Sequence, residues 1–87
     1  MAPKVIKVEP LENYQLRLTF SNGEIRCFDV TPNLDKGIFT ELKNIEYFQQ
    51  IEISFGSVQW LHEQDFSQDT LYLLSEPEES IVTPIST

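Results

Sequence analysis

A chain of 87 residues is long enough for one domain and no more. Hydrophobic residues make up 40% of the sequence and aromatic residues 11%, which excludes a disordered chain and predicts a packed core. The formal net charge of -8 argues against sequence-independent binding to DNA or RNA, because an acidic surface repels phosphate.

The first half of the chain predicts a strand and then a β-hairpin. Residues 4–9 form the strand, and Pro10 is expected to end it because proline cannot donate to a strand ladder. Residues 14–20 alternate between apolar and polar without error, and residues 24–30 form the return strand. The Asn22-Gly23 step between them tolerates the positive φ that a tight hairpin turn requires.

The middle of the chain changes to a helical period over residues 34–50. Gly37 and Asn44 are expected to break this segment into two short helices, with Thr40 or Asn44 as the N-cap of the second. The apolar stripe of the segment should lie on the sheet.

A second hairpin is predicted over residues 51–62, with its turn at Gly56-Ser57. In this register Ile51, Ile53 and Phe55 face inward, against Val58 and Trp60.

The last predicted element is a short helix over residues 68–74, with Ser67 as its N-cap. The expected fold is therefore α+β: a small antiparallel sheet of two hairpins plus an N-terminal strand, with short helices packed on one face. The domain is predicted to cover residues 1–74, and residues 75–87 are predicted to be a flexible acidic tail.

No group of residues predicts a catalytic centre, a metal site or a cofactor. His62 is the only histidine, and it lies near Glu63, Asp65 and Asp69, so a small metal-dependent enzyme using the loop from His62 to Asp69 is the alternative hypothesis. That loop lacks the glycine and the final glutamate of an EF-hand. Cys27 lies in a predicted strand, where a thiol behaves as a small apolar side chain.

Three aromatic residues are the candidates for binding a protein partner: Trp60, Phe66 and Tyr72. Asp65 and Asp69 lie beside them and would surround an exposed aromatic patch with acids. The alternative is that the sheet needs Trp60 as the largest piece of its core.

The acidic excess belongs to the C-terminal third, because residues 63–79 contain six acids and no lysine or arginine. This distribution permits a basic small protein as partner, with a homodimer through a sheet edge as a further option. The alternative is that these acids form a solvated surface with no partner. With no apolar run of about 18 residues, no secretory signal and one cysteine, the sequence predicts a cytoplasmic protein that does not enter a membrane.

The order of these residues resembles a known family. The stretch KVIKVEPLENYQLRLTFSNGEIRCFDVTPNLDKGIFTELKN, with the later VQW and DFSQDTLY, is similar to the small bacterial family called domain of unknown function 2442. The resemblance covers roughly residues 4–72, and NGEIRCFDV is its most specific part. The chain departs from the family at residues 61–64, where members often carry a Pro-Asn-Gly-like turn.

The resemblance implies a small α+β domain with no established activity. Some members are encoded beside another small protein, an arrangement similar to that of toxin–antitoxin pairs. By this association, the resemblance implies a protein-binding or regulatory role.

Overall fold

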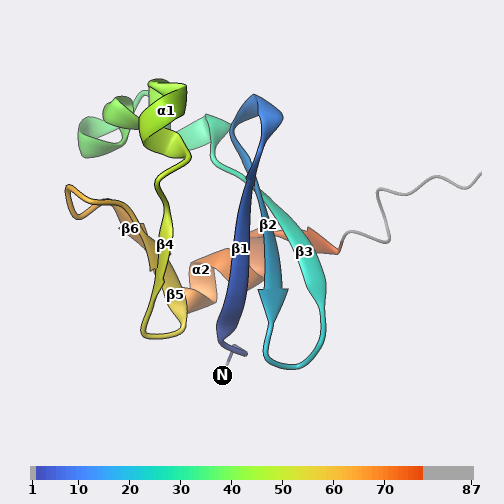
Figure 1. Ribbon diagram of the computed structural model, residues 1–87. Helices are drawn as coiled ribbons and strands as arrows, with labels where there is room; N and C mark the ends of the chain where they lie inside the picture. The colour runs from blue at the N-terminus through green and yellow to red at the C-terminus, as the bar shows by residue number, and fades with distance from the viewer. Residues whose placement is uncertain (1, 78–87) are drawn as a thin grey trace, which may run out of the picture.

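The computed structural model describes residues 2–77 and has an α+β fold with two antiparallel sheets (Figure 1). The first sheet has the order β1-β2-β3-β7, and its strands are Val5–Leu11, Gln15–Phe20, Ile25–Asp29 and Glu76–Pro77. The second has the order β4-β5-β6, with strands Glu52–Ser54, Ser57–Gln59 and Asp65–Phe66. The α+β class is as predicted.

The two hairpins lie in separate sheets, whereas the sequence analysis expected them to share one. The neighbouring edge strands β1 and β4 run side by side, and the Val5 amide donates to the Gly56 carbonyl at 2.9 Å. No regular ladder joins these two strands among the described residues, so the sheets diverge and leave room for side chains between them. Helix α2 (Gln68–Leu74) contacts both β3 and β5 and closes that space (Figure 1).

The other helical segments are short. They are the 3-10 turns η1 (Glu12–Tyr14), η2 (Thr31–Asn33) and η3 (Gly37–Lys43) and the helix α1 (Ile45–Phe48). Asn44 caps α1 by accepting from the amides of residues 46 and 47, and Ser67 caps α2 by accepting from the amide of Thr70. The predicted break of the helical segment and the predicted Ser67 cap are therefore confirmed. Among residues 2–77, no helix is both long and apolar enough to cross a bilayer.

The first hairpin matches its prediction. Leu16, Leu18 and Phe20 on β2 are buried, as their alternation indicates, and Gly23 in the turn has a φ of 93°.

The N-terminal strand ends later than predicted. Strand β1 runs through Pro10, which pairs with Leu16, and ends at residue 11. Proline is tolerated there because β1 is an edge strand of its own sheet.

The second hairpin has a different turn from the one predicted. Ser54 pairs with Ser57, so the two-residue loop is Phe55-Gly56 rather than Gly56-Ser57. The expectation that Phe55 faces inward is wrong, since its side chain is fully exposed. Ile53 pairs with the buried Val58 and therefore lies on the inner face as predicted, although its side chain is 39% exposed. Phe55 leaves the strand because it occupies the first loop position.

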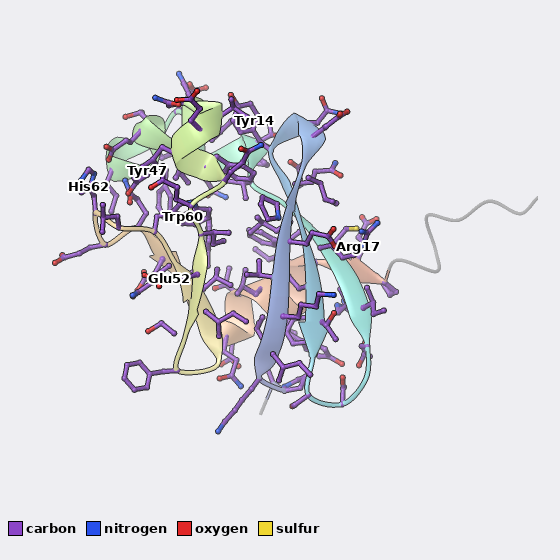
Figure 2. All side chains as sticks on the ribbon, viewed as in Figure 1. Tyr14, Arg17, Tyr47, Glu52, Trp60 and His62 are labelled. Carbon is purple, nitrogen blue, oxygen red and sulfur yellow. The ribbon has the colours of Figure 1, made fainter. Side chains whose placement is uncertain are left out.

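The core lies between the two sheets and α2. Trp60 and Phe48 are at its centre, and the Trp60 indole Nε1–H donates to the Phe48 carbonyl at 2.9 Å within the apolar interior. Figure 2 shows the Trp60 side chain directed into the molecule below α1. The buried apolar residues are Val5, Leu16, Leu18, Phe20, Phe28, Val30, Leu34, Leu42, Phe48, Val58, Trp60, Phe66 and Leu71.

The described residues that follow the predicted end of the domain, 75–77, pack on the first sheet. Ser75 is buried, and the Arg26 guanidinium donates to the Ser75 hydroxyl and carbonyl oxygens, both at 2.7 Å. Residues 76 and 77 then pair with β3 as strand β7. Residues 75–77, which the sequence assigns to the tail, are thus held on β3 by a charged group and a short strand. The rest of the predicted tail, residues 78–87, lies outside the described residues.

Candidate functional site

Two of the three aromatic residues predicted to bind a partner are part of the core. Trp60 is 1% exposed and Phe66 is 8% exposed. Their rings pack edge to face with centroids 6.2 Å apart, and Phe66 also packs edge to face on Phe28. These side chains are not available to a partner in the folded chain, so an exposed aromatic patch centred on Trp60 is not present among the described residues.

Tyr72, the third aromatic residue, is half-buried and is held by contacts within the chain. Its hydroxyl donates to a Glu24 carboxylate oxygen at 2.5 Å, and the Arg26 guanidinium lies 4.6 Å from its ring centroid. The hydrogen bond from Tyr72, followed by those from Asn22 and Arg26, lowers the pKa of Glu24 below its ordinary value. The bond to Glu24 raises the pKa of Tyr72. These contacts fasten α2 to the first hairpin.

An acidic row lies on the outer face of the second sheet. Glu52 on β4 pairs with Gln59 on β5, which in turn pairs with Asp65 on β6. Successive side chains of a strand point to opposite faces, and Val58 and Phe66 point into the core, so the row points outward. Figure 2 shows Glu52 on the side of the sheet turned away from β1. We call Glu52, Gln59 and Asp65 the acidic sheet face.

The carboxylates of this face are not neutralised within the domain. Glu52 and Asp65 are exposed, and the structure gives neither of them a salt bridge to any described residue. Glu63, in the turn between β5 and β6, is likewise exposed. The described part of the chain therefore presents three uncompensated acids along this hairpin and its neighbouring strand.

A buried amide fixes the turn that carries Glu63. Gln64 is 1% exposed, and its Oε1 accepts a hydrogen bond from the Tyr47 hydroxyl at 2.7 Å. Its Nε2 donates to the Ile38 carbonyl at 3.0 Å and to a Glu41 carboxylate oxygen at 2.9 Å. Because three hydrogen bonds satisfy this side chain, the β5–β6 turn is anchored to η3 and α1.

His62, in the same turn, is bound to a residue that the sequence analysis did not consider. Its Nδ1 lies 2.7 Å from a Glu41 carboxylate oxygen, and its ring stacks on Tyr47 with centroids 5.3 Å apart. Figure 2 shows His62 and Tyr47 close together at the outer end of the turn. The hydrogen bond from His62, and then that from Gln64, lowers the pKa of Glu41. The hydrogen bond with Glu41 and the stacking on Tyr47 hold the His62 imidazole in position.

The residues of the hypothetical metal loop are not brought together. His62 faces Glu41, Asp65 belongs to the sheet face, and Asp69 lies in the first turn of α2. Among residues 2–77, no three histidine, cysteine, aspartate or glutamate side chains are grouped so that they could hold a metal ion. The geometry gives the metal-enzyme alternative no support.

Of the acidic sheet face, only Asp65 was predicted as a site residue from the sequence. Alternation along the second hairpin marks Glu52 and Gln59 as outward-facing, but their alignment with Asp65 depends on the turn position. The network of Glu41, Tyr47 and Gln64 was also missed, because nothing in their spacing signals contacts between residues that lie 17 or more positions apart.

Acidification is expected to destabilise the domain through Glu41 and Glu24. The pKa of each is lower in the folded chain than its ordinary value of 4.5, so each stabilises the fold above that pH. This contribution is lost as the pH falls through the lower, folded-state value. Urea unfolding at intervals from neutral pH to pH ~3 should show a falling free energy of unfolding, and Glu41→Gln should flatten the decline. An unchanged pH profile in Glu41→Gln would contradict this assignment.

A family model described as "Protein of unknown function (DUF2442)" matches residues 5–77. The match covers most of the chain and ends at the last residue that the structure describes. Neither a curated protein nor a solved structure matches the chain. The chain therefore belongs to the DUF2442 family, as its hairpin sequence indicated.

Proposed function

We propose that this member of the family is a non-catalytic protein-interaction domain, whose acidic sheet face binds a basic segment of a second small protein. The observation that carries the proposal is the cross-strand row of Glu52, Gln59 and Asp65, which no lysine or arginine of the described residues neutralises. An outward row of this kind contributes little to the stability of the domain itself, because exposed charges interact weakly with their own chain.

The form of the face suits extended basic ligands. Two carboxylates flank one amide on adjacent strands, so each group lies about 5 Å from its neighbour along the row. A guanidinium pairs with a carboxylate through two parallel hydrogen bonds, and the Gln59 amide both donates and accepts. An arginine-bearing segment crossing the strands would therefore satisfy all three groups.

The anchored turn strengthens the proposal. Gln64 and the pair of His62 and Glu41 fix the backbone on either side of Glu63, so this acid is presented beside the sheet face with little loss of loop entropy on binding. Preorganisation of this kind is typical of surfaces that bind partners with little rearrangement.

The biological setting is also part of the proposal. The chain would be one half of a two-protein complex, similar to a toxin–antitoxin pair, in which its acidity neutralises or regulates a basic partner. The complex would form in the cytoplasm, where reducing conditions suit a chain with the single cysteine Cys27.

Reversing the charges of the face is expected to weaken the complex. The chain would be co-expressed with the protein encoded by the adjacent gene, and binding would be measured by isothermal titration calorimetry. Glu52→Lys with Asp65→Lys should weaken binding at least about tenfold, which is about 1.4 kcal/mol, and the wild-type affinity should fall steeply with salt.

The matched control is Glu12→Lys with Glu46→Lys, which makes the same change in net charge in η1 and α1, outside the second sheet. It should leave the affinity within about twofold of wild type. Equal losses in the control and the double variant, or no complex with the neighbouring product, would contradict the proposal.

A further inference from the structure

Phe55 is the most unusual residue of the described surface. Its side chain is 101% exposed, although phenylalanine gains most from burial. Its backbone has a φ of +50°, in the left-handed region that bulky residues avoid. Phe55 therefore contributes nothing to the core and strains the turn that carries it.

The turn would be easier to form with another residue. Phe55 and Gly56, with φ values of +50° and +79°, are the two central residues of a two-residue hairpin loop with both φ angles positive. Asn-Gly is the preferred sequence for such a loop, because asparagine and glycine both tolerate a positive φ. A residue that contradicts the backbone preference of its position, and does not stabilise the fold, is commonly kept for a function.

A hollow lies at the same end of the molecule as Phe55. It has a volume of about 310 Å³ and is lined by Ala2, Asp69, Tyr72 and Leu73. Leu73 is 73% exposed, so the hollow offers apolar surface to an incoming side chain.

The glycine that follows Phe55 in the turn lies against residues next to this hollow. A Cβ atom on Gly56 would lie 2.9 Å from the Lys4 side chain and 3.3 Å from the Gln68 amide oxygen. The Gln68 amide in turn donates to the carbonyl of Ala2, which lines the hollow. Figure 1 shows the β4–β5 turn and the N-terminus at one end of the fold.

Two opposite charges frame this end. Lys4 lies beside the turn, Asp69 lines the hollow, and the structure gives neither of them a salt bridge within the described residues. One copy of the chain therefore carries a projecting aromatic ring next to a cation, and an apolar hollow next to an anion. When a second copy is related by a two-fold axis, the ring and cation of each copy can face the hollow and anion of the other.

We propose that the chain forms a symmetric homodimer in which Phe55 of each copy inserts into the hollow of the other, with Lys4 of one copy paired to Asp69 of the other. This contact uses the end of the domain rather than a sheet edge, and it does not depend on the proposed partner of the acidic sheet face. The net charge of -8 on each copy opposes association, but repulsion beyond a Debye length of about 8 Å is screened in roughly 0.15 M salt.

The first test is sedimentation equilibrium of the whole chain in roughly 0.15 M salt, over concentrations up to ~500 μM, a range that detects weak interfaces. Wild type should shift from monomer to dimer across this range, and Phe55→Asn should raise the dissociation constant at least about tenfold. Leu61→Asn removes another exposed apolar side chain, from the β5–β6 turn, and should leave the dissociation constant unchanged. A wild-type chain that stays monomeric, or a dimer that Phe55→Asn does not weaken, overturns the proposal.

Unfolding of the same variants separates the contact from a folding defect. Because asparagine suits the positive φ, Phe55→Asn should raise the urea midpoint of the monomer while it weakens the dimer. A lower midpoint would show that Phe55 supports the fold of its own chain, which also overturns the proposal.

A charge exchange tests the orientation. Lys4→Glu and Asp69→Lys should each weaken the dimer, because each places like charges opposite one another. When the two variants are mixed, both contacts of the heterodimer join opposite charges: the introduced glutamate faces the introduced lysine, and the native Lys4 faces the native Asp69. Association should therefore return to within about threefold of wild type. Failure of the mixture to associate better than either variant alone contradicts the two-fold arrangement.

Discussion

Trp60→Ala is expected to remove most of the free energy of unfolding of the chain. The indole is 1% exposed at the centre of the core, packs on Phe48 and Phe66, and donates to a backbone carbonyl. Replacing a buried tryptophan with alanine typically costs about 3–5 kcal/mol, through lost burial and the cavity left behind. Small domains have a total free energy of unfolding of roughly 5–15 kcal/mol, and a chain of this size lies toward the lower end.

Far-ultraviolet circular dichroism during urea unfolding would measure this loss. Leu61→Ala, in the adjacent position but exposed, should change the free energy of unfolding by less than about 0.5 kcal/mol. A Trp60→Ala chain as stable as wild type would mean that the indole is not part of the core, and would favour a partner-binding role for it instead.

Gln64→Ala is expected to have the second-largest effect, a loss of about 2–3 kcal/mol. The substitution removes an acceptor from the Tyr47 hydroxyl and two donors, from the Ile38 carbonyl and the Glu41 carboxylate. The partners left behind are partly shielded from water, so the loss exceeds that of an exposed hydrogen bond.

The control for this prediction is Gln59→Ala, which truncates the same side chain on the outer face of the same hairpin. It should change the free energy of unfolding by less than about 0.5 kcal/mol. In Gln64→Ala, the backbone amide of His62 should also exchange hydrogen faster, because its acceptor is the Tyr47 hydroxyl that Gln64 orients. Equal stabilities of the two variants would show that the buried network does not hold the turn.

Prediction from sequence succeeded where the decisive interactions are local. The Asn22-Gly23 step and the alternation of β2 predict the first hairpin, because turn geometry and strand periodicity depend only on neighbouring residues. Ser67 was correctly placed as the cap of α2 for the same reason, since its side chain reaches an amide three residues away.

Prediction failed where two local choices differ by a single residue. Moving the second turn from Gly56-Ser57 to Phe55-Gly56 places Phe55 in the loop instead of on the inner face. Propensity disfavours phenylalanine in that position, so local preference does not predict this register.

The amino-acid sequence by itself determined the α+β class, the first hairpin, the capped C-terminal helix and the acidic character, because each follows from composition or from contacts within a few residues. Tertiary structure decided which residues became functional candidates: it buried Trp60 and Phe66, aligned Glu52 with Asp65, and exposed Phe55 at the β4–β5 turn. The physical reason is that burial and cross-strand alignment depend on how two sheets and a helix pack together, which local periodicity does not encode.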